Sequence, residues 1–444
     1  MAGTVAVISL GCSKNLVDSE RLMKMLESVG YDVIAEPDET FLDSDTERHV
    51  VINTCGFIGD AKEESINEIL SWAELRRQGR IHGLYVMGCL SQRYPDDLPP
   101  ELPEVDRWYG KTDWPALATD LSRLHPGSAP YDRVLTTPRH HAYLKIAEGC
   151  DRFCAFCAIP LITGRYRSRD IDEIVEEVRM LVARGVKEFN VIAQDLTSYG
   201  RDLYGRPSIA RLVDAIADVE GVEWIRLHYA YPNEFPMDLL DVMASRPNVC
   251  RYLDIALQHI SDSVLSNMRR HITGAETRAL LAEIRRRVPG IHLRTTLMVG
   301  FPGEGEKEFE ELMDFVREQR FERMGAFAYC EEDDTYAARH YSDDIPDEVK
   351  QERLARLMAL QEEISQEIQD TKVGTVQRVI IDREEPDCYV GRTQYDSPEV
   401  DPEVLIEKTI PLARGSFADV IIRTAYPFEL AGAPYENTTA GDRC

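Results

Sequence analysis

Three cysteines lie within eight residues of each other in the stretch GCDRFCAFCAIP (149–160). They are Cys150, Cys154 and Cys157, in a C-x3-C-x2-C pattern. Thiolates are soft ligands that suit zinc and iron–sulfur clusters. Zinc sites usually combine a C-x2-C pair with a second pair elsewhere, whereas this triplet is compact. A four-iron cluster held by three thiolates keeps one iron open, and an open metal position can bind substrate.

Two alternatives remain open for this triplet. The first is a three-cysteine zinc site with a distant fourth ligand, for which His140 or His141 is available. The second is plain packing, because cysteine is readily buried as a small hydrophobe. The residues that flank the triplet favour a cluster.

Three further cysteines are far apart in the sequence but share one pattern. Each follows a short apolar run that is predicted to be a strand, and each precedes a helix; they are Cys12, Cys55 and Cys89. The carboxyl ends of parallel strands lie on one edge of the sheet, the usual place for ligands. One such cysteine is easily explained by burial, but three in successive units are not. We therefore predict a second cluster with three thiolate ligands and an open iron, close to helix N-termini that favour negative charge.

The elements that must position these cysteines can be predicted from the hydrophobic pattern. Residues 1–130 alternate strands and helices, which is typical of a parallel sheet, and a loop rich in Pro, Gly and His (124–141) ends this region. The predicted strands are 4–10, 49–54 and 83–88, and the predicted helices are 17–30 and 61–77.

A second region, residues 140–371, repeats this alternation about six times and predicts a partial (β/α) barrel. Its strands are expected at 142–148, 188–193, 224–229, 252–257, 292–300 and 324–329. The cysteine triplet follows the first of them, which puts it at the carboxyl-terminal rim where barrel active sites lie. A long charged helix (345–372) ends the region, with Pro346 at a position where helices can start.

Residues 372–444 change pattern once more, so the expected class is α/β with a small all-β C-terminal barrel. Short strands alternate there with Pro, Gly and Asp. They are expected at 375–382, 388–393, 404–408 and 417–426.

The amino-acid composition limits which kinds of partner the protein is expected to bind. The 444 residues include 51 Lys and Arg against 78 Asp and Glu, for a net charge of −27. This acidity argues against bare nucleic acid as the main partner and suits a basic protein, although solubility alone would also explain it. No apolar run reaches the roughly 18 residues of a membrane span, and the N-terminus has the pattern of a strand rather than a signal peptide. We expect a cytoplasmic protein, whose ten cysteines are more readily ligands than disulfides.

On a barrel, GCDRFCAFC resembles the signature of the radical S-adenosylmethionine (SAM) superfamily. The resemblance implies that SAM binds the open iron of a 4Fe-4S cluster and is cleaved reductively to a 5′-deoxyadenosyl radical. It places Phe156 near the adenine of SAM. It also suggests SAM or substrate contacts at later strand ends and in the basic run after the triplet, namely Gln194, Asp195, Gly300, Gly303, Glu304, Arg165, Arg167 and Arg169. Helix caps, a turn and a solvated face are the ordinary alternatives.

The whole chain is similar to the methylthiotransferases. GCSKN, NTCGFI and GCL match their N-terminal motifs, and the segment from VGTVQRVIID to VIIRTAYPFEL resembles a TRAM domain. This resemblance covers nearly all of the chain. It implies two 4Fe-4S clusters, one on each cysteine triplet, in a transferase that also needs an electron donor.

Within this family, several stretches resemble the RimO type, whose substrate is ribosomal protein S-twelve. They are GCSKNLVDSE, CAFCAIPLITGRYRSR, QDLTSYGRD, LHYAYP and YLDIALQH. The segment 373–444 carries seven Lys or Arg and thirteen Asp or Glu, a net charge of −6. An acidic TRAM domain would repel phosphate and attract a basic ribosomal protein, so no direct nucleic-acid binding is expected. Aromatic residues there are candidate partner contacts, with core packing as the alternative: Tyr389, Tyr395 and Phe428.

The resemblance implies the following reaction. One SAM methylates a sulfur on the open iron of the N-terminal cluster, and a second SAM yields the radical. The radical removes hydrogen from the β-carbon of an aspartate in S-twelve, free or in the small ribosomal subunit. The carbon radical then captures the methylthio group, and the cluster takes up an electron. A tRNA (adenosine) methylthiotransferase, expected to carry a basic C-terminal barrel, and a non-catalytic iron–sulfur carrier, which would not cleave SAM, are the rival functions.

One stretch departs from the family pattern. YCEEDDT has Cys330 and Asp334 where a small residue and glycine are expected, which concerns the local turn. The cysteines outside both triplets are predicted to have no ligand role: Cys250, Cys330, Cys388 and Cys444.

Overall fold

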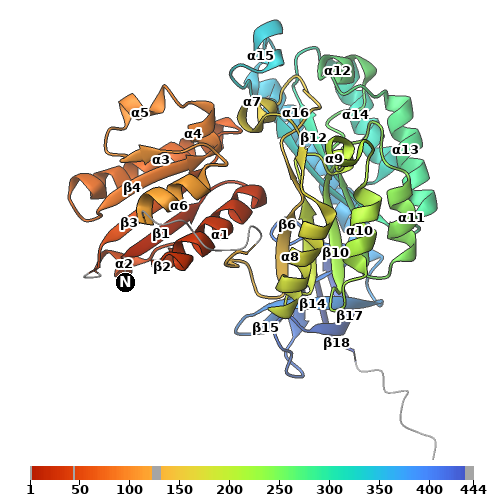
Figure 1. The fold of residues 1–444 in the computed structure, drawn as a ribbon. Coiled ribbons are helices and arrows are strands. Elements are labelled where there is room, and N and C mark those ends of the chain that lie inside the picture. The colour runs from red at the N-terminus through yellow and green to blue at the C-terminus, as the bar shows by residue number, and fades with distance from the viewer. Residues whose placement is uncertain (1–2, 44–45, 123–131, 436–444) are drawn as a thin grey trace, which may run out of the picture.

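The computed structural model describes residues 3–43, 46–122 and 132–435. It confirms the α/β class, with a parallel-sheet domain, a second and larger parallel sheet, and a closed C-terminal barrel (Figure 1). Residues 124–131 of the loop predicted as the first domain boundary, and Cys444, lie outside the described residues. No helix in the described part of the chain combines the length and the apolar composition that crossing a bilayer requires.

The N-terminal domain is a parallel sheet with strand order β2-β1-β3-β4-β5. Its strands are β1 (Thr4–Ser9), β2 (Asp32–Ala35), β3 (Arg48–Thr54), β4 (Gly83–Gly88) and β5 (Arg107–Trp108). Its helices are α1 (Ser13–Ser28), α2 (Glu39–Leu42), α3 (Gly59–Arg77), α4 (Cys89–Arg93), α5 (Leu98–Glu101) and α6 (Trp114–Ser122). The register pairs Ser9 with Asn53 and Thr54 with Gly88, so β1, β3 and β4 end at the same level.

The central sheet is parallel throughout, in the order β13-β12-β11-β10-β9-β6. These six strands are β6 (His141–Lys145), β9 (Glu188–Ile192), β10 (Trp224–Ala230), β11 (Val249–Ile255), β12 (His292–Val299) and β13 (Arg323–Ala328). A small antiparallel pair, β7 (Ala147–Glu148) and β8 (Arg167–Ser168), flanks the first strand. The order is that of consecutive strand–helix units, which confirms the partial barrel.

Helices cover the outer face of this sheet (Figure 1). The elements between and after the strands of this sheet are α7 (Ile159–Thr163), α8 (Ile171–Ala183), the 3₁₀ turn η1 (Leu196–Ser198), α9 (Arg201–Tyr204), α10 (Ile209–Ala217), α11 (Asp238–Ser245), α12 (Asp262–Asn267), α13 (Gly274–Arg287), α14 (Glu306–Gln319), α15 (Tyr336–His340) and α16 (Asp347–Asp370). Apolar residues recur at helical spacing and are buried, as in α10, where Leu212, Val213 and Ile216 are fully buried. Burial of these stripes against the strands stabilises the barrel and leaves its strand ends free for chemistry.

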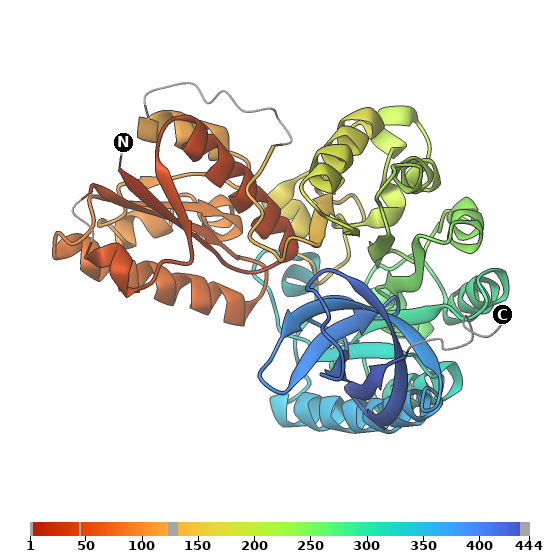
Figure 2. The same ribbon diagram turned by 90° about the horizontal axis from the view of Figure 1, so that it is seen from below.

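The C-terminal barrel closes in the order β14-β15-β16-β18-β17. Its strands are β14 (Val376–Glu384), β15 (Cys388–Thr393), β16 (Glu403–Glu407), β17 (Phe417–Tyr426) and β18 (Glu429–Pro434). Figure 2 views the molecule from the end that this barrel covers. Buried ion pairs join it to the amino ends of the central strands: Arg392 binds Glu188 at 2.7 Å, and Asp396 binds Arg323. The opposite, carboxyl-terminal rim stays clear of it.

Four strands escaped the sequence-based prediction because they lack a strong apolar run, and one of them is the two-residue strand β8 in the basic run after the triplet. β2 and β5 lie at the edges of the N-terminal sheet and are partly exposed, and β18 is the short return strand ELAGAP. Of the aromatic residues proposed as partner contacts, Tyr389 packs in the barrel core and Tyr395 stacks on His292 with ring centroids 4.0 Å apart. Phe428 is 57% exposed and stays available for a partner.

Candidate functional site

The triplet Cys150, Cys154 and Cys157 occupies the loop between β7 and α7, at the carboxyl-terminal rim. The loop is held from both sides by backbone hydrogen bonds. The Ala155 N–H donates to the Met268 carbonyl at 2.9 Å, and the Ala155 carbonyl accepts from the Ala337 N–H at 2.7 Å. The Cys157 N–H donates to the Cys154 carbonyl at 3.1 Å, which turns the chain tightly within the triplet. A compact, anchored loop therefore presents three thiols from one short segment.

Two side chains from later strand–helix units reach Cys154. The Arg270 guanidinium donates to its sulfur at 3.3 Å, and the Tyr231 hydroxyl lies 3.8 Å from it. Arg270 also stacks on the Tyr231 ring, 4.1 Å from its centroid. Burial raises the pKa of Cys150 to about 12 and also raises that of Cys157. The positive charge of Arg270 next to Cys154 would stabilise a group that is bound through thiolates.

The predicted SAM contacts are spread over the same rim. Phe156 is partly buried among apolar side chains, with its ring centroid 6.2 Å from that of Phe301 in an edge-on contact. Gln194 follows β9 and donates its amide to Glu148, while its buried Oε1 has no partner in the described structure. Asp195 caps η1 by accepting from the Thr197 N–H at 2.8 Å, and it also binds Arg152.

Gly300 and Arg165 lie at the margins of this arrangement. Gly300 directly follows β12 and has a positive φ of 74°, and a Cβ there would lie 2.4 Å from Cγ of Lys350 in α16. Its backbone N–H donates to Glu304, which is buried and also binds Arg353. The Arg165 side chain is 78% exposed and lies 3.3 Å from Asp151. The structure thus brings Gln194 and Asp195 to the strand ends beside the triplet, while Arg165 points into solvent.

The second set of cysteines converges at the ends of three neighbouring strands. Cys12 is the N-cap of α1 after β1, Cys55 directly follows β3, and Cys89 begins α4 after β4. A Cβ added to Gly11 would come within 2.9 Å of the Cys55 sulfur, which shows how closely the first two segments approach. Gly56 is equally tight against the Cys89–Leu90 backbone. Sheet topology therefore gathers residues that are 77 positions apart in the sequence.

Asn15 links these three strand ends. Its amide donates to the carbonyls of Leu10 and Thr54, at 3.1 and 3.0 Å. Its Oδ1 accepts from the Lys111 ammonium at 2.9 Å and lies 3.5 Å from the Cys89 sulfur. Because the side chain is fully buried and uses both ends of its amide, it fixes how the cysteines face each other.

Two buried lysines set the charge at this site. Desolvation alone would raise the pKa of Cys12, but the positive charges of Lys14 and Lys111, together with backbone N–H donors, lower that pKa. Burial raises the pKa of Cys55, and that of Cys89 to about 11. Each of these thiols also senses the charge of another member of the set, as expected for groups close in space.

The two cysteine sites face each other across the domain interface. Cys89 packs with Ala158 and Ile162, which directly follow the triplet. A buried ion network ties the same edges together. Lys111 binds Asp18 at 3.3 Å and Glu148 at 3.9 Å, while Lys145 binds both of these carboxylates, Glu148 at 2.8 Å. The contacts hold the N-terminal site opposite the barrel rim.

Backbone strain also concentrates at this rim. Several non-glycine residues there have left-handed φ values: Phe153, Tyr229, Gln258, Arg269 and His271, between 50° and 71°. Such conformations cost about 1–3 kcal/mol each and persist where the surroundings impose them, commonly at active sites. Tyr229 also lies under the Lys14 ammonium, 3.7 Å from its ring centroid, so the strain extends to the domain interface.

The donors at both sites are thiols, whose soft sulfur suits iron–sulfur clusters. All six thiols are free. Across residues 3–43, 46–122 and 132–435, no three His, Cys, Asp or Glu side chains come close enough to share one metal ion. A four-iron cube takes its thiolates at separate corners, so its ligands stand farther apart. His140 binds Asp382 at 2.8 Å and His141 starts β6, both at the end of the strand away from the triplet, so neither is placed to be the fourth ligand of a zinc site there.

The departures from the family pattern have local explanations. Asp334 has a φ of 63°, so the position where glycine was expected does adopt a left-handed backbone. Cys330 is exposed and its sulfur approaches Gly59 of the N-terminal domain. Cys250 is buried in β11 and Cys388 begins β15, both remote from the two triplets in the fold.

Several residues of the site were missed from the sequence. Asn15 and Lys14 lie in the motif GCSKN and Tyr231 in LHYAYP, so their motifs were noted but their roles were not. Arg270 and Lys111 lie in MRRHITG and YGKTD, which carry no recognisable pattern. Only the fold brings these cations to the cysteines.

Three family models match this chain in sequence order. The description of the first is uncharacterized protein family UPF0004, over residues 4–110. The second is the Radical SAM superfamily, over residues 144–316. The third is the TRAM domain, over residues 373–434. Together they account for most of the chain.

Curated relatives match almost end to end. A protein of Parabacteroides distasonis is 60% identical over 96% of this chain and 98% of its own length. A Porphyromonas gingivalis protein is 59% identical with the same coverage, and one from Christiangramia forsetii is 50% identical over 98% of this chain and 95% of its own. Each is named ribosomal protein uS12 methylthiotransferase RimO, uS12 being ribosomal protein S-twelve.

Solved structures share the fold at low sequence identity. The radical SAM methyltransferase TsrM of Kitasatospora setae has a TM-score of 0.54 and 17% identity, covering 74% of this chain and 75% of its own. The cobalamin-dependent SAM radical enzyme OxsB has a TM-score of 0.52 and 14% identity, covering 81% of this chain and 56% of its own. These likenesses concern the fold alone.

Proposed function

The chain belongs to the RimO type of the radical SAM methylthiotransferase family, and from this membership we propose its substrate and site. It attaches a methylthio group to the β-carbon of an aspartate in ribosomal protein uS12. The observation that carries the proposal is the pair of cysteine triplets on facing strand ends, with Cys89 packed against the helix that follows Cys157. One triplet suits a radical generator, and the other suits a holder of the sulfur to be transferred.

We assign a 4Fe-4S cluster and SAM to the triplet Cys150, Cys154 and Cys157. When bound, they supply a carbon-centred radical strong enough to take hydrogen from an unactivated carbon. The β C–H of an aspartate is too weakly acidic for easy base chemistry, which is why such a radical is needed. A second 4Fe-4S cluster is assigned to Cys12, Cys55 and Cys89, with one iron left open for sulfur.

The residues around each triplet would bind and orient these groups. At the rim, the Arg270 N–H stabilises the Cys154 sulfur, and the unpartnered Oε1 of Gln194 is available to accept a hydrogen bond from SAM. Phe156, Asp195, Gly300 and Arg165 complete the proposed SAM contacts. The protein thereby contributes positioning and exclusion of water, while the hard chemistry belongs to the cofactors.

At the N-terminal site, the buried cations have a different role. Lys14 and Lys111 offset the negative charge of three thiolates and their cluster, which would otherwise be costly to bury. Asn15 holds Lys111 beside Cys89. The ion network of Lys111, Lys145, Asp18 and Glu148 keeps the sulfur site facing the radical site.

The proposed partners follow from the same function. The substrate is a basic ribosomal protein, the acidic C-terminal barrel is a suitable docking module for it, and an electron donor completes the cycle. We place the enzyme in the cytoplasm with its substrate. The proposed domains are 1–130 for the N-terminal cluster, 140–371 for the barrel and 372–444 for the TRAM barrel.

A mass spectrum of uS12 tests the proposal directly. Recombinant uS12 is incubated anaerobically with the cluster-reconstituted protein, SAM, sulfide and a reductant. We expect the mass increase of one methylthio group replacing hydrogen, mapped to an aspartate by fragmentation. A uS12 variant with alanine at the mapped position is the matched control and should stay unmodified.

The other outcomes discriminate the rivals. Formation of 5′-deoxyadenosine without a mass shift on uS12 or on small subunits would contradict the substrate assignment, and bulk tRNA would then be assayed for methylthioadenosine. Reconstituted clusters that cleave no SAM would point to the non-catalytic carrier.

A further inference from the structure

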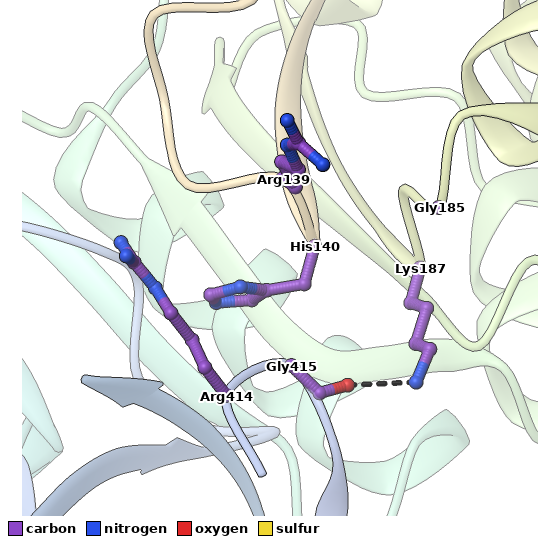
Figure 3. Close-up of a pocket in the computed structure, with 6 residues that line it drawn as sticks. All are labelled: Arg139, His140, Gly185, Lys187, Arg414 and Gly415. Carbon is purple, nitrogen blue, oxygen red and sulfur yellow. Dashed lines mark hydrogen bonds between the residues drawn. The ribbon is translucent and has the colours of Figure 1, made fainter. Parts of the chain in front are cut away.

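A basic recess lies at the amino-terminal end of the central (β/α) barrel, which is the end away from both cysteine sites. It is about 310 Å³ in volume and is lined by Arg139, His140, Gly185, Lys187, Arg414 and Gly415. Figure 3 shows that Arg139, His140 and Lys187 come from the central (β/α) barrel, while Arg414 and Gly415 come from a loop of the C-terminal barrel. No carboxylate is among these lining residues, in a chain whose net charge is −27.

The floor of the recess is built rigidly. The Lys187 ammonium donates to the Gly415 carbonyl at 2.7 Å (Figure 3). Gly415 has a φ of 74°, and a Cβ there would lie 2.8 Å from Cβ of His140, so the loop can approach only as glycine. The His140 ring binds Asp382, whose carboxylate is also held by Arg392. The basic walls are therefore fixed relative to each other.

The two arginines of the recess have no protein partner. Within the described residues, neither Arg139 nor Arg414 makes a side-chain hydrogen bond, an ion pair or a ring contact, and both are exposed. Most other arginines of this acidic chain are paired with carboxylates, as Arg392 is with Glu188 and Asp382. Two free guanidiniums on one recess are available to an external anion.

A second recess extends the basic surface. It is about 420 Å³ and is lined by Lys24, Arg133, Val134, Leu135, Arg139 and Arg184. Arg139 belongs to both recesses, so they adjoin. We name the basic groove after its five surface cations: Lys24, Arg139, Arg184, Lys187 and Arg414. Lys24 and Arg184 are each paired with a carboxylate, Glu27 at 3.1 Å and Asp132 at 2.6 Å, so within the described residues the unpaired guanidiniums of the groove are those of Arg139 and Arg414.

We propose that the basic groove binds phosphate groups of an RNA backbone that accompanies the substrate, an inference that rests on the proposed function. Guanidiniums bind phosphate through paired N–H groups, and successive phosphates present one charge per nucleotide. A groove with several cations suits such a chain of charges better than a single small anion. A basic ribosomal protein cannot fill it, because like charges repel.

The position of the groove sets how far a partner shared with the cysteine rim has to reach. His141 and Lys145 bound β6, a five-residue strand that spans about 17 Å at 3.3 Å per residue, and the cysteine loop begins beyond its far end. A partner that touches the groove and also offers an aspartate to the rim must extend over this distance. RNA packed around a ribosomal protein meets this requirement, so the groove favours uS12 within the small subunit over the free protein.

Charge reversal in the groove tests the inference. The variant Arg139→Glu/Arg414→Glu is compared with Arg286→Glu/Arg317→Glu, which makes the same charge change on exposed faces of α13 and α14. The probe is a fluorescein-labelled oligouridylate of about 20 nucleotides, and fluorescence anisotropy is measured between 50 and 200 mM KCl. We expect the groove variant to bind about tenfold more weakly than the control, with a salt slope reduced by about 1.4 for two lost contacts.

A second readout separates this inference from the proposed function. The rates of methylthiolation of isolated small subunits and of free uS12 are measured with each variant, and we expect only the groove variant to lower their ratio, by about tenfold. Equal RNA affinity and an equal ratio in both variants would overturn the groove assignment, as would binding of inorganic phosphate as tight as that of RNA. If the wild-type enzyme modifies neither substrate, the proposed function fails, whereas the anisotropy result still decides whether the groove binds RNA. A milder pair, Arg139→Gln/Arg414→Gln, replaces the groove variant if its iron content falls.

Discussion

The two cysteine sites of this protein contrast in how they are assembled. The rim site takes Cys150, Cys154 and Cys157 from one loop, held by local backbone hydrogen bonds. The N-terminal site takes Cys12, Cys55 and Cys89 from three strand ends, which are level because of the register of a parallel sheet. The first site depends on a short segment, whereas the second depends on the whole domain.

The charged groups around the two cysteine sites also differ. The rim triplet has one cation at hydrogen-bond distance, Arg270, and burial raises the pKa values of Cys150 and Cys157. The N-terminal triplet lies beside two buried lysines that lower the pKa of Cys12. A site that must hold SAM needs room beside its cluster, while a site that carries an extra sulfur gains from surrounding positive charge. The difference therefore suits a division of labour.

Removing one thiol from each site gives the largest expected effect. In Cys150→Ala, both SAM cleavage and methylthiolation should be lost. In Cys55→Ala, 5′-deoxyadenosine should still form, but methylthiolation of uS12 should fall by at least about a hundredfold. When residues act together as one unit, removing any one of them commonly abolishes the function of the unit. Chromatography of the nucleoside and mass spectrometry of uS12 measure both. Continued methylthiolation by Cys55→Ala would break the two-site comparison.

A glycine pair tests whether the N-terminal site depends on close strand packing. Gly11→Ala adds a Cβ 2.9 Å from the Cys55 sulfur, so about half of the iron should be lost while SAM cleavage persists. Gly164→Ala, directly after α7, is the matched control, because its φ of 71° is similarly left-handed but its Cβ would meet nothing within 4 Å. It carries only the backbone strain of about 1–2 kcal/mol. Iron and sulfide analysis measures the cluster content of both variants. Equal losses of iron would show that backbone strain, and not crowding of the Cys55 sulfur, causes the effect.

Gln194 sharpens the picture of the rim site. Its Oε1 is buried and unpartnered in the described structure, so Gln194→Ala should remove a hydrogen bond to SAM worth about 1.4 kcal/mol, or tenfold in KM, with a smaller change in kcat. Steady-state kinetics of 5′-deoxyadenosine formation measure this split. The exposed Arg206→Ala serves as a neutral comparison. An unchanged KM would remove Gln194 from the proposed SAM contacts.

The smallest expected effect concerns the cation at the rim. Arg270→Gln removes a charged N–H donor from the Cys154 sulfur, so the potential of the rim cluster should fall by some tens of millivolts, because a lost positive charge disfavours the added electron. Arg270→Lys keeps the charge and should restore part of the shift. Redox titration followed by electron paramagnetic resonance measures it in Cys55→Ala protein, where only the rim cluster remains. A shift of equal size in Arg269→Gln would show that the contact is not specific.

Much of this arrangement follows from the sequence alone. The apolar runs predicted six central strands and three N-terminal strands because buried parallel strands are continuously hydrophobic. The spacing of the rim triplet is local, so a short stretch is enough to identify it. Even the position of Cys12, Cys55 and Cys89 at strand ends could be predicted, since each follows an apolar run directly.

What only the tertiary structure decided are the contacts between distant segments. Arg270 reaches Cys154 over 116 positions, and Lys111 reaches Asn15 over 96, with no periodicity to reveal either. The net charge predicted an acidic protein without nucleic-acid contacts, yet the fold gathers Arg139 and Arg414 into one recess. The pattern of burial can be predicted from the sequence because each residue faces one side of its own helix or strand. The partners of charged side chains cannot be predicted in this way, because they depend on how separate elements pack together.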